Sequence, residues 1–334
     1  MNVFSLLQPF LLAAAIALLV TPLVIRLAKR LKMVAIVNQA RWHRKPIPLL
    51  GGVGIFIAST TSYFVLSEEI SWLLLGGSLT SFTTGLWDDI KDKSPLFKIF
   101  GQLLAGSFLV LSETTFETGF YITDCLSTLF WTVLITNSIN LLDNMDGVAA
   151  GVSAIIAGIC GIVLLTLHLN LAALISFCCM GACIGFLAFN FKPASIFMGD
   201  SGSLLLGYHM SFLSILTVRA VAVSPAEQFT TALILLALPI TDTLFVVLSR
   251  IKSGVSIFQG GKDHLSHRMA RKGYSEATVA LCLYFFAIMW SSAILFKAVL
   301  DKNVFLIYTT VVGLLTIAFC FRLSSFRSIK QANH

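Results

Sequence analysis

The segment ISWLLLGGSLTSFTTGLWDDIKD, residues 70–92, joins a long apolar run to a group of carboxylates. Its apolar part approaches the length of about 20 residues that a helix needs to cross the hydrocarbon core of a bilayer. Asp88 and Asp89 follow this run directly, and charged groups at the mouth of a membrane helix are costly to place unless they have a function. The segment therefore predicts a membrane-spanning helix that ends in a functional site.

The composition places the whole chain in a membrane. Of its 334 residues, 57% are hydrophobic and 12% are charged, whereas soluble domains carry about 25% charged residues. The mean hydropathy is +0.89, and no polar stretch is long enough to form a soluble domain. We therefore predict an all-α polytopic integral membrane protein whose single domain covers residues 1–334.

Apolar stretches recur along the chain at the spacing of a helical membrane protein. We expect about 11 transmembrane helices, several of them near the lower limit of about 17 residues for crossing the hydrocarbon core. The expected spans are approximately 3–25, 49–66, 70–87, 99–112, 124–142, 148–167, 171–189, 202–217, 228–248, 277–296 and 304–321. No basic residue precedes the first span and a basic cluster follows it, so we interpret it as a retained anchor rather than a signal peptide.

The basic residues are distributed unevenly between the expected loops. All except Arg219, Lys297 and Lys302 fall on one side of the membrane. By the positive-inside rule that side is the cytoplasm, which puts the N-terminus outside and the C-terminus in the cytoplasm. The net charge of +7 is then a property of the topology, and it does not indicate binding to nucleic acid.

Four polar clusters share the expected cytoplasmic face. The first is DDIKD at 88–92, whose carboxylates lie on one face if the helix continues by one turn. Such a group can hold Mg²⁺, which prefers oxygen ligands, or it can supply a base. The alternative is a solvated helix end neutralised by Lys91. Lys98, at the start of the next span, is a candidate phosphate contact.

The second cluster is NSINLLDNMDG at 137–147. Amides recur there at helical spacing from Asn137 and Asn140, and two acids, Asp143 and Asp146, follow. Amides inside lipid either link helices by hydrogen bonds or contact a ligand. The density of amides and acids in this cluster favours a binding or catalytic role.

The third cluster consists of NFKP at 190–193 and FMGDSGS at 197–203. Pro193 ends one helix and Gly-Asp-Ser-Gly-Ser opens the next. Small residues and the free N–H groups of a helix N-terminus favour the close approach of a phosphate. Asp200 suits a metal ion that bridges to phosphate oxygens, although Asp and Ser are also ordinary N-cap residues.

The fourth cluster is GGKDHLSHR at 260–268. His264 and His267 are three residues apart, but zinc needs further ligands, and the seven cysteines have no metal-type spacing. With Arg268 and other basic residues nearby, an anion-binding loop is the better interpretation. A basic stop-transfer loop is the alternative.

Three further positions carry weaker signals. Lys45 lies in a basic segment before the second expected span and is a candidate phosphate contact. Asp242 is intramembrane and follows Pro239, so it is either functional or paired. His209, inside a span, is more typical of a hydrogen-bonded packing residue than of a ligand.

Taken in this order, the four clusters resemble the signature motifs of the polyprenyl-phosphate N-acetylhexosamine-1-phosphate transferases, which form glycosyltransferase family 4. The matching motifs are Asp88-Asp89-x-x-Asp92, Asn140-Leu-Leu-Asp143-x-x-Asp146-Gly147, Phe197-x-Gly199-Asp200-x-Gly202-Ser203 and His264-x-x-His267-Arg268. Each motif is moderately specific, and the four in sequence are highly specific. The resemblance implies an enzyme of the bacterial inner membrane that transfers a sugar-1-phosphate, most simply GlcNAc-1-phosphate, from a UDP-sugar to undecaprenyl phosphate and releases UMP at the cytoplasmic face.

The resemblance also implies roles for single residues. Asp200 would ligate Mg²⁺, for which Mn²⁺ is a substitute, and Asn140 would lie beside it. Asp88 or Asp89 would act as the base for the lipid phosphate or position it. The other implied catalytic residues are Asp143, His264 and His267, and the implied substrate-binding residues are Asp146, Asn190 and Phe197 at the uracil and Lys45, Lys98 and Arg268 at the phosphates.

Several alternatives stay open. Phospho-MurNAc-pentapeptide translocases typically have a lysine in place of Asp92 and three consecutive histidines in the last loop, so the chain favours a simple UDP-N-acetylhexosamine over the peptide-bearing donor. An aspartate-rich intramembrane prenyltransferase would need neither the Gly-Asp-Ser-Gly-Ser turn nor the histidine loop. A secondary transporter would carry its acids at mid-span. The resemblance is compatible with a homodimer.

Overall fold

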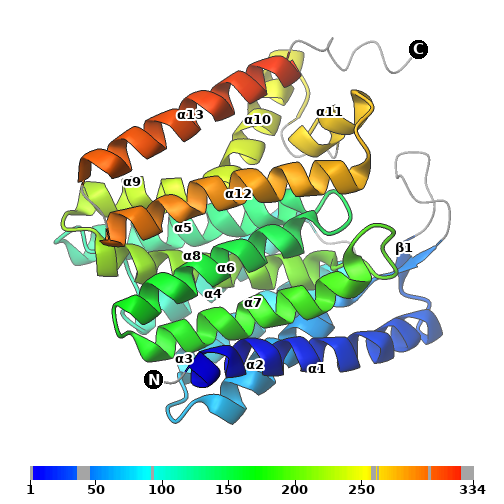
Figure 1. The fold of residues 1–334 in the computed structure, drawn as a ribbon. Coiled ribbons are helices and arrows are strands. Elements are labelled where there is room, and N and C mark those ends of the chain that lie inside the picture. Colours follow the sequence, from blue (N-terminus) through cyan, green and yellow to red (C-terminus); the bar gives the residue numbers. More distant parts are fainter. Residues whose placement is uncertain are drawn as a thin grey trace.

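The computed structural model describes residues 3–35, 46–91, 94–256, 261, 263–299 and 302–324. These residues form thirteen helices (Figure 1). The helices are α1 (Val3–Arg30), α2 (Gly51–Leu66), α3 (Trp72–Lys91), α4 (Pro95–Leu111), α5 (Tyr121–Leu142), α6 (Val148–Thr166), α7 (Asn170–Asn190), α8 (Gly199–Val221), α9 (Pro225–Leu235), α10 (Ala237–Ser253), α11 (Leu265–Arg271), α12 (Glu276–Val299) and α13 (Lys302–Ser324). Lys45, Asp92 and Lys262 lie outside the described residues.

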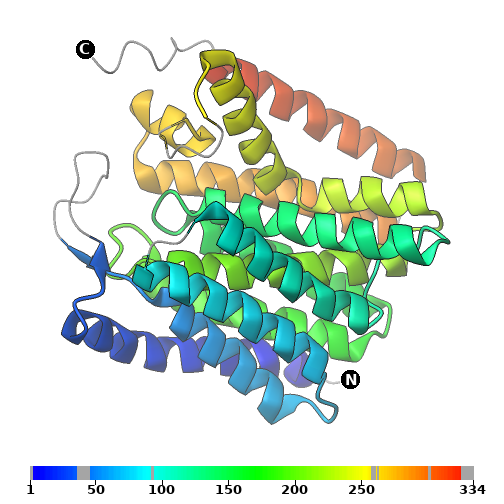
Figure 2. The ribbon, with the colours of Figure 1, turned by 180° about the vertical axis from the view of Figure 1, so that it is seen from behind.

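Helix α8 occupies the centre of the bundle. Helices α6, α7 and α12 lie on one side of it (Figure 1), and α3, α4 and α5 lie on the other (Figure 2). Helices α2, α3, α5 and α6 all pack against α8, and α1 packs against α2 and α7 at one edge. A short antiparallel ladder joins β1 (Val34–Ala35) to β2 (Ile47–Pro48). Within the described residues this ladder is the exception to an otherwise helical fold.

The prediction of an all-α polytopic membrane protein is confirmed. Among the described residues, seven helices are long and apolar enough to cross a membrane, and an eighth span is added if α9 and α10 count as one. Helices α2 and α4 are apolar but shorter. Each of the expected spans overlaps a helix, whereas the number of about 11 crossings stays a prediction.

One expected span is wrong as a single helix. In place of a continuous span at 228–248, α9 and α10 meet at an angle of 80°. Pro239 is the cause that the sequence offers, since it has no N–H to donate to the carbonyl of Leu235 and its ring crowds that carbonyl. The chain therefore changes direction around Leu236, and α10 diverges from the bundle (Figure 1).

Glycines allow α2 and α3 to touch the first turn of α8. A Cβ on Gly52 would lie 2.2 Å from the backbone nitrogen of Gly202, and a Cβ on Gly85 would lie 2.2 Å from the carbonyl oxygen of Asp200. Real side chains do not tolerate such distances, so only glycine lets these three backbones meet. The first turn of α8 is thus fixed by two neighbouring helices.

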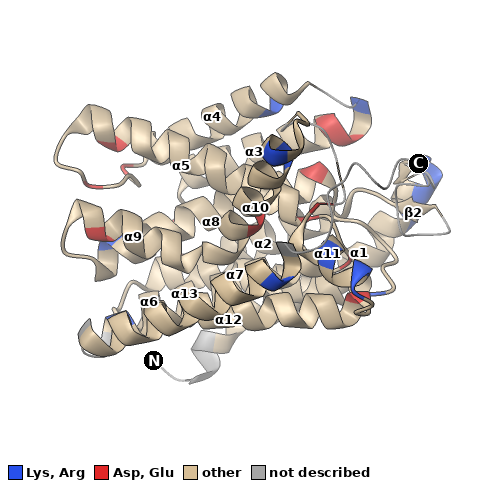
Figure 3. Cartoon of the chain, turned by 90° about the horizontal axis from the view of Figure 1, so that it is seen from above, with Lys and Arg blue, Asp and Glu red and all other residues tan. Residues whose placement is uncertain are grey.

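Charged residues gather at the two ends of the bundle, while the helix lengths between them are almost free of charge (Figure 3). Of the basic residues in the described ranges, only Arg219, Lys297 and Lys302 belong to the end where α8 stops and α13 starts. There Arg219 pairs with Glu117 at 2.5 Å, and Lys297 pairs with Glu227. The other end carries the remaining basic residues and all four polar clusters.

We expect Gly52→Val to destabilise the protein by at least about 2 kcal/mol, because the side chain forces the backbones of α2 and α8 apart. Thermal unfolding in detergent, followed by circular dichroism, measures this loss. The matched control is Gly313→Ala in α13, where the nearest atom to the new Cβ is 3.8 Å away. That control keeps or raises the melting temperature, since alanine favours a helix over glycine. Equal melting temperatures for Gly52→Val and the wild type would contradict the close approach.

Candidate active site

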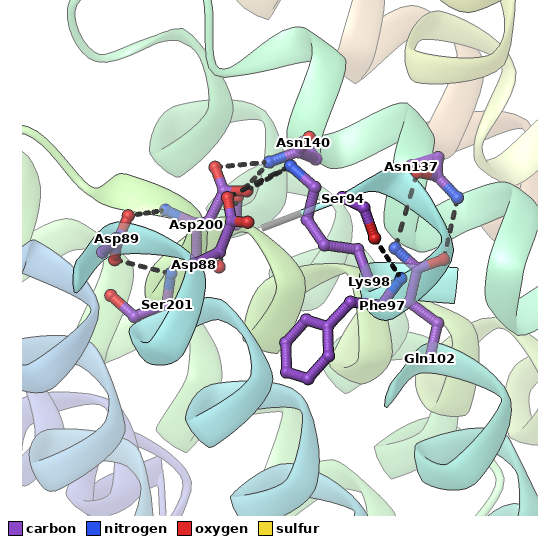
Figure 4. Close-up of polar contacts among 11 residues, drawn as sticks. Asp88, Asp89, Ser94, Phe97, Lys98, Gln102, Asn137, Asn140, Asp200 and Ser201 are labelled. Carbon is purple, nitrogen blue, oxygen red and sulfur yellow. Dashed lines mark hydrogen bonds and ion pairs between the residues drawn. The ribbon is translucent and has the colours of Figure 1, made fainter. Parts of the chain in front are cut away.

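The carboxylate of Asp89 holds the N-terminus of α8. Its Oδ1 accepts the N–H of Asp200 at 2.7 Å, and its Oδ2 accepts the N–H of Ser201 at 3.0 Å (Figure 4). Gly199 precedes these donors with φ 72°, and a Cβ there would lie 2.7 Å from Asp89 Oδ2. A negative charge at this position also interacts favourably with the helix dipole.

This arrangement corrects one alternative from the sequence. The residue before α8, Met198, makes no side-chain capping bond, and the cap comes from the last turn of α3 instead. The carboxylate of Asp200 is therefore not used as an ordinary N-cap, and it points to other side chains.

Lys98 joins two of the carboxylates. Its Nζ lies 2.8 Å from Asp200 Oδ2 and 3.2 Å from Asp88 Oδ2 (Figure 4). Helix α4 begins at Pro95 after Ser94, whose hydroxyl accepts the N–H of Phe97, so Lys98 projects from the first turn of α4. Three helices, α3, α4 and α8, thus bring opposite charges together at one point.

The amides of the second cluster have two different roles. Asn140 donates from Nδ2 to Asp200 Oδ1 at 3.0 Å and to the hydroxyl of Ser203 at 2.8 Å. Asn137 instead donates to Gln102 Oε1 at 2.8 Å and so links α4 to α5. Asn140 belongs to the site, while Asn137 is a hydrogen-bond link between helices.

Two of the residues predicted to bind uracil connect loops in the structure. Asp146 Oδ2 accepts the N–H of Ala194 at 3.0 Å and lies 3.6 Å from Lys192 Nζ. Asn190 accepts the N–H of Gly147 at 3.1 Å and donates to the carbonyl of Ile196 at 2.9 Å. Both side chains tie the turn after α5 to the loop before α8.

Asp143 lies in that same turn, outside the span of α5. Burial and then the carboxylates of Asp200, Asp89 and Asp146 raise its pKa to about 8. Asp88 and Asp200, by contrast, share the single ammonium group of Lys98, so two carboxylates face one positive charge. A surplus of negative charge stabilises a cation that is bound beside it.

The donor chemistry of the site fits Mg²⁺. Within the described ranges, no three His, Cys, Asp or Glu side chains are grouped so as to hold a metal ion. Mg²⁺ does not require such a cage, since it is usually bound by one or two carboxylates together with water and phosphate oxygens. Asp88 and Asp200, which share the ammonium of Lys98, offer such a pair. His264 and His267 form no zinc site with a third described residue.

The described part of the fourth cluster, residues 263–268, is hydrogen-bonded to α10 and is called the histidine loop below. His264 Nδ1 lies 2.8 Å from Asp242 Oδ2, and its ring centroid is 5.8 Å from that of His267. Arg250 and Asp263, both buried, form two hydrogen bonds of 2.7 and 3.0 Å. The intramembrane Asp242, left open by the sequence as functional or paired, is therefore paired.

Arg268 and Ser266 of the histidine loop contact other helices and turns, and the spacing of residues in the sequence did not predict these contacts. The guanidinium of Arg268 lies 4.7 Å from the ring centre of Phe245 and donates to Ser249 at 2.8 Å. Ser266 donates to Asn144, in the turn that holds Asp143. Arg250, Lys192 and Ser266 are not among the predicted site residues, because each pairs with a residue that is distant from it along the chain.

Comparisons with known proteins show the family of the chain. The model of "Glycosyl transferase family 4" matches residues 71–218, which contain three of the four clusters. The probable undecaprenyl-phosphate N-acetylglucosaminyl 1-phosphate transferase of Bacillus subtilis is 31% identical, over 92% of this chain and 90% of its own length. The chain belongs to the family of polyprenyl-phosphate N-acetylhexosamine-1-phosphate transferases.

Other members of the family are similarly related. The decaprenyl-phosphate N-acetylglucosaminephosphotransferase of Mycobacterium leprae is 33% identical, over 86% of this chain and 81% of its own length. The phospho-N-acetylmuramoyl-pentapeptide-transferase of Moorella thermoacetica is 31% identical, over 86% and 96%. Identity alone therefore does not separate the two branches of the family.

We expect Asp89→Asn to destabilise the protein by about 1–3 kcal/mol. Asparagine has one acceptor oxygen where aspartate has two, so the N–H of either Asp200 or Ser201 is left without a hydrogen bond. The change in melting temperature in detergent measures this loss. The control is Glu117→Gln, which removes an exposed ion pair at the other end of the bundle and costs less than about 1 kcal/mol. If the two variants melt alike, Asp89 does not hold α8.

Asp143 gives a dependence of stability on pH. Its pKa in the fold, about 8, is above that of an unfolded aspartate, so the folded protein retains the proton over a range where the unfolded chain has lost it. In the absence of divalent cations, the contribution of Asp143 is therefore expected to lower the melting temperature as pH rises from about 4 to about 8, and to level off above that pH. Asp143→Asn should reduce this slope and melt higher than the wild type at pH 9. Parallel melting curves for the two proteins across this range would contradict the assignment.

Proposed function

We propose that the protein transfers GlcNAc-1-phosphate from UDP-GlcNAc to undecaprenyl phosphate and releases UMP. The observation that carries the proposal is the meeting of Asp88, Asp200, Asn140 and Lys98 at the polar end of an apolar bundle. The printed names of the relatives from Bacillus subtilis and Mycobacterium leprae support the sugar and the polyprenyl acceptor. A site at the membrane boundary suits a donor that is soluble in water and an acceptor that is soluble in lipid.

The reaction brings a phosphate monoester to a diphosphate, so several negative charges must approach one another. Mg²⁺, bound by Asp200 with Asn140 beside it, would neutralise charge on the diphosphate and polarise the phosphoryl group under attack. Lys98 would move part of its ion pairing from the carboxylates to the substrate phosphates. Preorganised cationic and hydrogen-bonding groups of this kind lower the barrier because they are in place before charge develops.

Asp88 is the better candidate for the group that faces the lipid phosphate. Both oxygens of Asp89 already accept backbone N–H groups, so using Asp89 as the base would release the first turn of α8. Asp88 shares Lys98 with Asp200 and needs no such rearrangement. We infer that Asp89 positions the metal-binding aspartate, while Asp88 positions or deprotonates the acceptor.

The nucleotide would occupy the loops around this point. Phe197 has a partly exposed ring and is the proposed stacking partner of uracil. Asp146 and Asn190 would act mainly by shaping the loop that carries Phe197, because their side chains form hydrogen bonds to the backbone of that loop. His264 and its neighbours would face the diphosphate. Arg268, like Lys98, is a proposed phosphate contact. The same role for Lys45, which lies outside the described residues, stays a prediction.

The lipid acceptor would approach beside α10. After the 80° bend, this helix exposes Leu244, Leu248 and Ile251, which are compatible with acyl or prenyl chains. Its last turn carries Arg250 and Lys252 near the basic end of the bundle. We propose that this end faces the cytoplasm of a bacterial inner membrane, because basic residues accumulate on the cytoplasmic side.

The test is the release of UMP by the purified full-length protein in detergent, with undecaprenyl phosphate, Mg²⁺ and a panel of UDP-sugars that includes UDP-MurNAc-pentapeptide. We expect release with UDP-GlcNAc, its loss on chelation of Mg²⁺, and a decrease of about 100-fold or more in Asp200→Asn. Glu117→Gln is the control and keeps wild-type activity.

The panel also decides between the two donors. Release with UDP-MurNAc-pentapeptide alone would replace GlcNAc by the peptide-bearing sugar. Activity that is equal in Asp200→Asn and the wild type would overturn the proposed site. No release by a folded wild-type protein with any donor would overturn the proposed reaction.

A further inference from the structure

A buried carboxylate on α10 is not used by the reaction proposed above. Asp242 lies in the second turn of α10, immediately after the bend, and is 2% exposed. Its Oδ2 lies 2.8 Å from His264 Nδ1, and its Oδ1 accepts the N–H of Leu265 at 2.8 Å. A carboxylate in an apolar segment is costly unless hydrogen bonds satisfy it, and these two contacts do so.

The two contacts determine which nitrogen of His264 carries a proton. The backbone N–H of Leu265 can only donate, and an ionised carboxylate can only accept. Asp242 therefore accepts from both partners, so Nδ1 of His264 bears hydrogen. No described residue forms a hydrogen bond to Nε2 of this ring, and Nε2 is the nitrogen that is left for a substrate.

The chain that follows His264 is bonded to the turn after α5, which also holds Asp143. Ser266, two residues after His264, donates to Asn144, which is next to Asp143 in the turn after α5. His267 lies on the same short helix, with its ring centroid 5.8 Å from that of His264. The bend of α10 thus brings an aspartate of the apolar bundle to a histidine of the fourth cluster.

We propose that Asp242 is a positioning residue that fixes the orientation and tautomer of His264 so that Nε2 contacts the diphosphate of the donor. This inference rests on the proposed function. Asp242 itself touches no substrate, and its effect passes entirely through His264. A carboxylate that orients a histidine in this way often contributes much more to the rate than to stability.

Asp242→Asn gives a sharp test because the amide cannot imitate both contacts. The N–H of Leu265 requires an acceptor, so the oxygen of the new amide turns toward Leu265 and its NH₂ turns toward His264. The NH₂ then donates to Nδ1 and moves the ring proton to Nε2. Nitrogen NMR of the ¹⁵N-histidine-labelled full-length protein reports this change, with the signal assigned by its loss in His264→Gln.

The kinetic test is a double-mutant cycle measured as UMP release. We expect Asp242→Asn to lower kcat/KM by about 10-fold or more in the wild-type background. In the His264→Gln background the same substitution should change kcat/KM by less than about twofold, because the residue through which it acts is already absent. Glu117→Gln is the control: it lies at the other end of the bundle, where Glu117 pairs with Arg219, and its effect should be the same in both backgrounds because distant sites act independently.

Each outcome has a separate meaning. A reversed tautomer together with an effect confined to the background that contains His264 supports the proposal. Equal losses in both backgrounds, unchanged activity in Asp242→Asn, or an unchanged tautomer would overturn it. If the wild type transfers no sugar phosphate, the proposed function fails, and the NMR measurement alone decides whether Asp242 fixes the ring.

Discussion

The hydrogen bonds between Asp89 and the first turn of α8 are the contact on which the site depends. They cross from one membrane helix to another, and they fix the backbone of Asp200 and Ser201 at the start of α8, the helix at the centre of the bundle. The contact requires close approach of the helices, which Gly85 permits on the side of α3. Once α8 is fixed in this way, the side chain of Asp200 can reach only the partners that α4 and α5 present.

The site is a concentration of negative charge that is only partly compensated. Asp88 and Asp200 share one ammonium group, and Asp143, in the next turn, has a raised pKa because of burial and its acidic neighbours. Such an arrangement costs stability in the free protein, and under the proposed function the binding of Mg²⁺ and substrate would offset that cost. The same carboxylates are thus unfavourable for folding and useful for phosphoryl transfer, which is common where binding sites conflict with local stability.

The sequence was sufficient for the helical membrane architecture, because apolar length predicted the helices. The first three motifs also predicted residues that the structure brings together, namely Asp88, Asp89, Asn140 and Asp200. The division of the amides was not predictable, since Asn137 and Asn140 differ only in whether the opposing helix offers Gln102 or Asp200. The cap by Asp89 and the pairing of Asp242 likewise depend on which helices are neighbours. The bend at Leu236 had one local signal, Pro239, but a proline at that position is compatible either with a kink in one helix or with the first turn of a new helix.

The bend also changes how the protein meets the bilayer. Helix α9 has 11 residues and α10 has 17, whereas a straight span needs about 20 to match the hydrocarbon thickness. Helices α2 and α4, with 16 and 17 residues, are short in the same way, and a bilayer adapts to short apolar segments by thinning. The bend of α9 and α10 thus adds a further place at which the surrounding bilayer has to match its thickness to the protein.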